Sequence, residues 1–401
     1  MNKDQLVILH ISLIDGVGAV TLRHILDHAR TKSLSFSDLS VACSGDTCSE
    51  LVCFYRYSLS DWIEGGITPR LARLLVDGLR DRSLLERELL LIERNGVSFV
   101  TIVDEEYPEL LRHIEVPPPI LYYRGAPFSE HKKCLSIIGS RKGTAYAQTF
   151  INSIVAPLCE CGWSIVSGGA IGVDTMAHRA TMARCATMAH CATMAHCATM
   201  AHCAVGCGGK TIAVLGSGLL VPYPASNKRL FEEIVEKGGT MVSAFSLQTL
   251  PSKGTFPARN RIIAGLSRGT LVVQAGERSG THITAYCALE EGREVFAVPG
   301  PYDDPLSCGC HSLVQQGAKL VTSVDEILAE FGEVYSGQSI GVPHGPCTLK
   351  EKILHLCREP ISIDELSVQL SLSPQEVQEQ LFPLQIDGLV EQDFVGMFQI
   401  T

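Results

Sequence analysis

The feature that most constrains the fold is a series of short apolar runs, rich in β-branched residues, that alternate with stretches of helical pattern. Six runs in the middle of the chain are predicted strands: residues 135–138, 164–166, 211–215, 241–244, 270–273 and 294–298. Continuously apolar strands separated by helices are typical of a parallel sheet covered by helices on both faces. The sequence therefore predicts the α/β class, with a doubly wound sheet.

Small and polar residues follow these strands at their carboxyl ends. They occupy residues 139–141, 167–169, 216–218, 274–281 and 299–300. Ligands of doubly wound sheets bind beyond the carboxyl ends of the strands, where backbone N–H groups at helix starts favour anions. Because Arg141 and Arg278 belong to these segments, we expect a groove lined for phosphates.

Residues 256–265 add a dense polar group in the form Phe-Pro-Ala-Arg-Asn-Arg-Ile-Ile-Ala-Gly. We expect a loop that leads into a helix. Arg259 and Arg261 supply forked donors for phosphate, and Phe256 offers a ring on which a base can stack. Lys253 adds another cation. The alternative interpretation is a solvated basic loop beside a buried phenylalanine, since most phosphate contacts resemble ordinary surface charge.

An ordered set of motifs extends through this core. They are Gly-Ser-Arg (139–141), Ser-Gly-x-Ala-x-Gly-x-Asp (167–174), Ala-His (177–178), Gly-Gly-Lys-Thr-Ile-Ala-Val-Leu-Gly (208–216), Tyr-Pro-x-x-Asn (223–227), Phe-Pro-x-Arg-Asn-Arg-Ile-Ile-Ala-Gly-Leu-Ser (256–267), Glu-Arg-Ser-Gly-Thr-x-Ile-Thr-Ala (277–285) and Gly-Arg-Glu-Val-Phe-Ala-Val-Pro-Gly (292–300). In content and order they resemble the bacterial DNA-processing protein A family. The resemblance implies a protein of natural transformation that binds single-stranded DNA on an extended Rossmann-like domain, dimerises and delivers the strand to the RecA recombinase.

The resemblance also implies a set of DNA-binding residues. Carried over one by one, they are Ser140, Arg141, Ser167, Gly168, Lys253, Phe256, Arg259, Asn260, Arg261 and Ser279. The expected partners are single-stranded DNA, RecA and a second copy of the chain. No catalytic residue, metal or cofactor is expected, and no membrane.

The first 95 residues are expected to form a helical domain. Residues 14–22 join two apolar helices through a Gly-x-Gly turn. That arrangement resembles a helix-hairpin-helix of the kind found in SAM-like domains, whose turn can present N–H groups to a phosphate. We favour a plain αα-hairpin, because Arg23 alone provides a nearby cation. Residues 71–91 are predicted to continue as one amphipathic helix, and residues 99–103 and 120–123 as strands added at the edge of the sheet.

The predicted core domain covers residues 96–331, and residues 332–346 form a linker rich in Gly, Ser and Pro. Residues 347–401 have the element order of a winged helix, with helices at 349–357 and 363–370. A third helix begins at Ser373-Pro374 in capping-box fashion, and a hairpin follows at 389–392 and 397–401. The third helix holds Glu376 and Glu379 and no Lys or Arg. We therefore favour a protein-interaction or dimer module over a DNA-binding one.

Residues 175–204 consist of five six-residue units, the last three of them identical copies of Thr-Met-Ala-His-Cys-Ala. We interpret most of this repeat as an insertion that forms an extended helix or a mobile excursion. A metal site is disfavoured, because six residues advance a helix by about 240° and turn successive His-Cys pairs in different directions. Just beyond it, Lys210-Thr211 resembles an NTPase phosphate-binding loop but is predicted to open a strand instead of a helix.

The formal charge of −10 argues against coating of nucleic acid by bulk electrostatics, but it is compatible with a local basic groove. The sixteen cysteines and the absence of a secretory signal predict a cytoplasmic protein with reduced thiols. The main alternative function is a nucleotide-binding enzyme of the nucleotide phosphoribohydrolase (lysine-decarboxylase-like) type. Its Pro-Gly-Gly-x-Gly-Thr-x-x-Glu signature is absent, and no nucleophile–base pair is evident. We therefore predict that the chain is not an enzyme.

Overall fold

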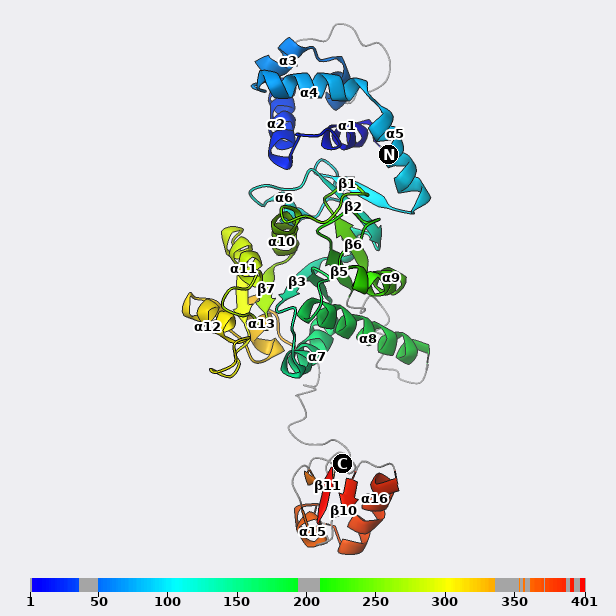
Figure 1. Cartoon of the computed structure of the whole chain (residues 1–401), viewed down its shortest axis with the longest axis vertical. Coiled ribbons are helices and arrows are strands. Elements are labelled where there is room, and N and C mark those ends of the chain that lie inside the picture. Colours follow the sequence, from blue (N-terminus) through cyan, green and yellow to red (C-terminus); the bar gives the residue numbers. More distant parts are fainter. Residues whose placement is uncertain are drawn as a thin grey trace. The chain divides into compact units, whose positions relative to one another are not determined.

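The computed structural model describes residues 2–35, 50–193, 210–335, 353, 356–357, 361–370, 372–386, 390–392 and 397–400. The chain divides into two compact units, residues 1–335 and residues 336–401 (Figure 1). Repeat residues 194–204 and linker residues 336–346 lie outside the described residues, so their predicted conformations stay predictions. In the described parts, we find no helix that combines the length and the apolar character needed to cross a membrane.

A nine-stranded sheet forms the centre of the larger unit. Its strands are β1 (Ser98–Thr101), β2 (Ile120–Gly125), β3 (Lys133–Ile138), β4 (Trp163–Ser167), β5 (Thr211–Val214), β6 (Thr240–Ser243), β7 (Gly269–Val272), β8 (Glu294–Ala297) and β9 (Lys319–Leu320). Their order is β1-β2-β6-β5-β4-β3-β7-β8-β9. The seven strands from β6 to β9 are parallel, whereas β2 pairs antiparallel with both β6 and β1. This confirms the predicted doubly wound sheet and its two added edge strands.

Helices cover both faces of this sheet. They are α6 (Glu109–Arg112), α7 (Ala145–Glu160), α8 (Val173–Thr193), α9 (Lys228–Glu236), α10 (Thr255–Leu266), α11 (Thr281–Glu290), α12 (Cys308–Gln315) and α13 (Val324–Glu330), with short 3-10 turns at Phe128–Glu130 and Ala225–Asn227. On one face, α10, α11 and α12 bury residues such as Ile262 and Ala285 against Val214 and Val272. On the other, α7, α8 and α13 bury residues such as Ile151 against the opposite side of β3 and β4. Alternate residues of each strand thus pack into two separate apolar layers, one on each face of the sheet.

Six helical segments precede the sheet in the described part of the chain. They are α1 (Lys3–Ser12), α2 (Ala19–Ser35), the 3-10 helix Glu50–Arg56, α3 (Leu59–Glu64), α4 (Pro69–Arg80) and α5 (Ser83–Arg94). In Figure 1, α1–α4 gather beyond the β1–β2 edge of the sheet. The prediction of one helix over 71–91 is wrong. The chain turns at Asp81, whose ψ of 103° is extended and whose carboxylate accepts the N–H of Ser83 at 2.9 Å. That local bond starts a second helix in a new direction.

The C-terminal unit contains α15 (Ile363–Leu370), α16 (Pro374–Ile386) and an antiparallel pair, β10 (Val390–Gln392) with β11 (Phe398–Ile400). At the start of α16, the Ser373 hydroxyl accepts the N–H of Glu376, whose carboxylate accepts the N–H of Ser373 at 2.8 Å. This is the predicted capping box. The two described helices and the hairpin follow the predicted winged-helix order, and the predicted helix at 349–357 lies largely outside the described residues.

Candidate functional site

The sheet has a topological switch point beside β3. From β3 the chain proceeds through β4 and β5 to β6, and it then returns to place β7 on the other side of β3. Beyond the carboxyl ends of these two strands lies a cleft of about 630 Å³. Its walls come from residues 138–142, 253–260 and 276–284. The ligand position expected for a doubly wound sheet is therefore an open cleft in this chain.

Backbone contacts fix the loop after β3 at the edge of this cleft. The Ser140 N–H donates to the carbonyl of Gln274 at 2.7 Å, and the Ser140 carbonyl accepts the N–H of Val173 at 3.1 Å. Gly172 makes this packing possible. It has a φ of +89°, and a Cβ at this position would lie 2.4 Å from the Ser140 carbonyl oxygen. The loop that carries Arg141 is thus tied both to β7 and to the start of α8.

The cleft is strongly cationic. Its lining holds five cationic side chains, those of Arg141, Lys142, Lys253, Arg259 and Arg278, against the carboxylate of Asp174. All of these cations except Arg259 are exposed. The first turns of α8, α10 and α11 also contribute residues to the lining, and helix N-termini favour anions. The arrangement is suited to bind several phosphate groups along one chain.

Arg259 is the one cation of the cleft that lies buried, with 8% of its surface exposed. Its Nη1 donates to the carbonyls of Gly168 at 2.5 Å and Val214 at 3.1 Å, and its Nε donates to the amide oxygen of Asn260 at 3.0 Å. A Cβ at residue 168 would lie 2.0 Å from Nη1. The guanidinium therefore occupies space that only a glycine leaves open, and it joins the ends of β4 and β5.

Asp174 lies against the same glycine. Its carboxylate accepts the N–H groups of Gly168 at 3.1 Å and Ala170 at 3.2 Å. Burial raises the pKa of this carboxyl above its usual value, while the nearby charge of Arg259 and the two backbone donors act in the opposite direction. We regard Asp174 as ionised at neutral pH, because a buried carboxylate with two donors and an adjacent guanidinium is compensated.

Residues 256–265 are helical, so the prediction that they form a loop is wrong. They belong to α10, which begins at Thr255. Pro257 is compatible with this because it lies in the first turn, where a backbone N–H has no partner within the helix. Two residues advance a helix by about 200°. Arg259 and Arg261 therefore leave α10 on opposite sides.

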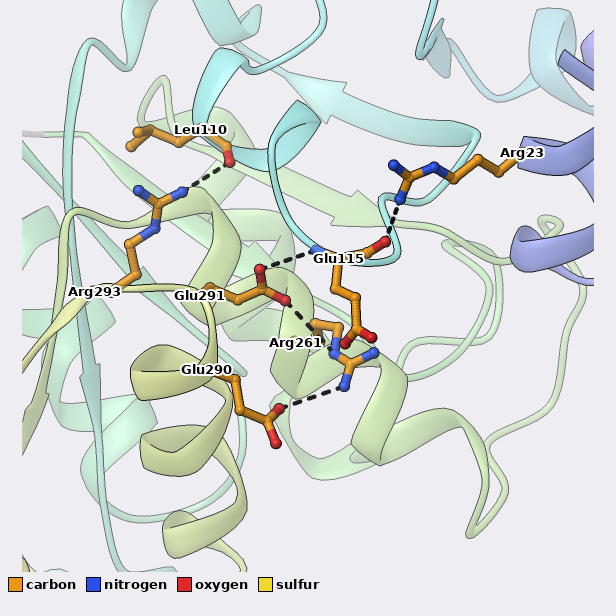
Figure 2. Close-up of polar contacts among 7 residues, drawn as sticks. All are labelled: Arg23, Leu110, Glu115, Arg261, Glu290, Glu291 and Arg293. Carbon is orange, nitrogen blue, oxygen red and sulfur yellow. Dashed lines mark hydrogen bonds and ion pairs between the residues drawn. The ribbon is translucent and has the colours of Figure 1, made fainter. Parts of the chain in front are cut away.

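Arg261 lies in a second cavity, on the other side of α10. Its Nη2 is 3.6 Å from a carboxylate oxygen of Glu290, and its Nε is 4.0 Å from one of Glu291. Figure 2 shows Arg261 between these two glutamates of the α11 end. The sequence placed both arginines in one groove, whereas the structure places Arg259 in the cationic cleft and Arg261 in the second cavity.

Two aromatic rings flank the cationic cleft. Phe256 is half-buried and lines the cleft, and it also lines an adjoining pocket of about 50 Å³ with Tyr223. The two ring centroids lie 5.7 Å apart with an edge-on geometry. Tyr223 is 44% exposed. A nucleobase therefore has an accessible aromatic surface beside the cations.

The structure gathers seven of the predicted site residues around the cleft: Ser140, Arg141, Lys253, Phe256, Arg259, Asn260 and Ser279. Gly168 lines the adjoining pocket. Ser167 lies beneath, fully buried, where its hydroxyl donates to the carbonyl of Ile137 at 2.7 Å. Sequence reasoning left out Lys142 and Tyr223. The first adjoins the Gly-Ser-Arg motif and the second opens the Tyr-Pro motif, so motif position was the available signal.

The other candidate chemistries find little support in the described residues. Lys210 directly precedes β5, which confirms that Lys210-Thr211 opens a strand; its ammonium pairs with Glu130. The cysteines whose side chains the structure describes are free thiols. In the same part of the chain no three His, Cys, Asp or Glu side chains gather as metal ligands. Most of the His-Cys repeat lies outside that part.

Comparisons with known proteins agree with the motifs. The family model of DNA recombination-mediator protein A matches residues 98–332, and that of the DprA winged helix domain matches residues 353–393. A DNA processing protein DprA from Bacillus subtilis is 38% identical over 251 residues, which are 62% of this chain and 76% of that protein. Its counterpart from Streptococcus pneumoniae is 41% identical over 231 residues, 58% of this chain and 73% of that protein.

A solved structure gives the same result for the fold. The X-ray structure of DNA processing protein A from Streptococcus pneumoniae superposes with a TM-score of 0.62 at 31% sequence identity, covering 82% of this chain and 98% of that one. The motifs, the doubly wound sheet and the winged helix therefore lead to one assignment. The chain belongs to the DNA recombination-mediator protein A family.

Proposed function

We propose that this protein binds single-stranded DNA in the cleft beyond β3 and β7 and acts in DNA processing. The observation that carries the proposal is the set of four exposed cations, Arg141, Lys142, Lys253 and Arg278, around one cleft at the switch point of the sheet. A row of cations binds the phosphates of any sequence, and an exposed ring beside it accepts any base. The cleft is therefore suited to a single strand without sequence preference.

The residues of the site have five roles in this proposal. The four exposed cations neutralise phosphates, while Ser140, Asn260 and Ser279 supply hydrogen-bond donors to the backbone of the strand. Arg259 acts as a positioning residue, because its Nη1 is committed to two carbonyls. Ser167 and Gly168 shape the floor. Phe256 and Tyr223 provide the aromatic surface.

Family membership supports a wider role. Relatives of this chain are named DNA processing proteins, and we extend that role to this chain. We propose that it protects incoming strands in the cytoplasm during natural transformation, works as a homodimer and loads RecA recombinase onto the strand. The C-terminal winged helix is proposed to be an interaction module, because the described part of α16 carries Glu376 and Glu379 and no Lys or Arg.

We further propose that the protein is not an enzyme. The Asp174 carboxylate is occupied by two backbone N–H groups, which leaves it poorly placed as a general base. The competing proposal, a nucleotide phosphoribohydrolase, predicts release of ribose 5-phosphate from nucleoside monophosphates. Detection of that product by the purified protein would overturn our proposal.

The binding test is a salt titration with a fluorescent single-stranded oligonucleotide. Four phosphate contacts predict that log affinity falls against log salt with a slope of about −3, at about 0.7 per contact. Arg141→Ala should reduce the magnitude of the slope by about 0.7 for every base composition. Lys237→Ala is the matched control, since Lys237 is exposed just beyond α9 and does not line the cleft. A slope near zero in the wild-type protein would contradict the phosphate-binding cleft.

A further inference from the structure

The second cavity, on the Arg261 side of α10, is larger than the cationic cleft. Its volume is about 870 Å³. One wall is the turn between α1 and α2, residues 12–19, and the opposite wall comes from α10 and the exposed side of α11. Between them lie Pro118, Pro119 and Phe245. The cavity is therefore bordered by apolar and aromatic side chains from segments far apart in sequence.

This cavity adjoins the cationic cleft. Pro257 in α10 and Ile283 in α11 line both. The side chain of Ile283 is 46% exposed. A flexible chain that leaves the cationic cleft across these two residues therefore enters the second cavity directly.

The charges of the second cavity are unsuited to phosphates. Its lining holds two carboxylates, Asp15 and Glu290, and one cation, Arg261, which is already paired with Glu290 and Glu291. Carboxylates repel phosphates, but they accept hydrogen bonds from the amino groups of cytosine, adenine and guanine. Tyr286, 47% exposed, adds a ring at the wall. The chemistry thus favours a nucleobase and disfavours the backbone that carries it.

A polar network holds the walls of this cavity together (Figure 2). Glu291 accepts the N–H of Glu115 at 3.0 Å, and the carbonyl of Glu115 accepts a donor of Arg23 in α2. Arg261 is 4.0 Å from the same Glu291. The α1–α2 hairpin is thereby linked through one loop to α10 and α11. A preformed cavity costs less ordering when it takes up a ligand.

We propose that the second cavity is a base-binding subsite for the same DNA strand, which continues from the cationic cleft across Pro257 and Ile283. Phosphates stay in the cationic cleft, and one or more unstacked bases enter the second cavity against Tyr286. Asp15 and Glu290 accept hydrogen bonds from base amino groups, so thymine is the least favoured base. This inference rests on the proposed binding of single-stranded DNA.

The test compares a short oligonucleotide of about 5 nucleotides, which fills the cationic cleft, with one of about 20, which also reaches the second cavity. Tyr286→Ala should weaken binding of the long oligonucleotide by about tenfold, because base stacking is lost. Binding of the short one should not change. Leu289→Ser is the matched control, because Leu289 is 49% exposed on the same helix and lines neither cavity.

Base preference gives a second readout. The long deoxycytidine oligomer should bind more tightly than the long thymidine oligomer, and the double variant Asp15→Ala, Glu290→Ala should remove that preference. Thermal melting of each variant separates loss of binding from loss of fold. Equal binding of the long oligonucleotide by wild type and Tyr286→Ala would overturn the subsite and leave the face to a protein partner. Failure of wild type to bind either oligonucleotide would instead contradict the proposed function itself.

Discussion

The cavities on the two sides of α10 receive an arginine each from the same helix, two residues apart, and use it in opposite ways. On the cleft side, Arg259 is buried and donates to backbone carbonyls, whereas four other cations of the cleft are exposed to solvent. On the other side, Arg261 is partly exposed and lies between two glutamates. Arginine content alone therefore says little about phosphate binding; what matters is whether the guanidinium already has partners.

The largest expected difference between the two arginines is in their effect on the stability of the fold. Arg259→Ala removes the donor of two buried carbonyls and leaves the Asp174 carboxylate without its neighbouring cation. We expect the free energy of unfolding to fall by about 3–5 kcal/mol, as for other uncompensated buried charges. Arg261→Ala removes a partly exposed ion pair with Glu290 and a 4.0 Å contact with the buried Glu291, which keeps the N–H of Glu115, and should cost only about 1 kcal/mol.

Guanidinium chloride denaturation of both variants measures this difference. Arg259→Lys should recover only part of the loss, because an ammonium lacks the planar fork that reaches both carbonyls. Equal midpoints for Arg259→Ala and Arg261→Ala would refute the division between a buried and a surface arginine.

A change of pH is expected to alter the stability of the core and to leave the DNA affinity of the two cavities nearly unchanged. Burial lowers the pKa of His178 to about 3 and that of His131 to about 4, from a usual value near 6.5. Each imidazole stays neutral in the folded chain and is protonated in the unfolded chain as the pH falls through 6.5. The contribution of the two neutral imidazoles to stability is thus fully present above pH 6.5 and is lost as the pH falls toward 4.

With two such histidines, the free energy of unfolding should fall by about 4 kcal/mol between pH 7 and pH 5, at about 1.4 kcal/mol per group and pH unit below 6.5. Burial lowers the pKa of His10 in α1 as well, which acts in the same direction. Neither His131 nor His178 lines the cationic cleft or the second cavity, so the DNA affinity of the folded protein should change far less over this range. Denaturation midpoints that do not vary between pH 5 and pH 7 would be inconsistent with neutral buried histidines.

Sequence reasoning located the sheet because its parallel strands are continuously apolar, and it located the cleft because small and polar residues follow those strands. It missed β9, a two-residue strand whose Lys319 gives no apolar signal. It also missed the break between α4 and α5, which contains neither Gly nor Pro. The apolar pattern registers neither feature. The strand β9 exists only by pairing with β8, and the helix break rests on the local bond between the Asp81 carboxylate and the N–H of Ser83, which leaves no mark on the apolar period.

The site shows the same limit at the level of single side chains. Motif reasoning brought Arg141, Lys253 and Asn260 toward one place, and all three line the cleft, because parallel strands end at the same edge of the sheet. It could not tell that Pro257 lies in a first helical turn, so it grouped Arg259 with Arg261. Which arginine is buried depends on a glycine at residue 168, far away in the sequence, that leaves room for the guanidinium.

The smallest expected effect concerns the aromatic rings beside the cleft. Phe256 is half-buried, packs edge-on against Tyr223 and lies 5.9 Å from the Arg259 guanidinium. If a base stacks in the adjoining pocket, Phe256→Ala should lose about 1–3 kcal/mol of single-strand affinity. The salt slope should not change, because no phosphate contact is removed. Some stability should be lost too, since the ring is partly core.

Tyr223→Ala isolates stacking from packing, because this ring is 44% exposed. We expect an affinity loss of about 1 kcal/mol with little change in melting temperature, and Tyr223→Trp should retain most of the affinity. Tyr302→Ala, at a position that is 90% exposed and lines neither cavity, is the matched control. If Tyr223→Ala binds DNA like the control and Phe256→Ala lowers only the melting temperature, both rings contribute to the packing around the cleft and neither stacks on a base. The cations alone would then hold the strand, and the difference between the two cavities would lie in charge and not in aromatic surface.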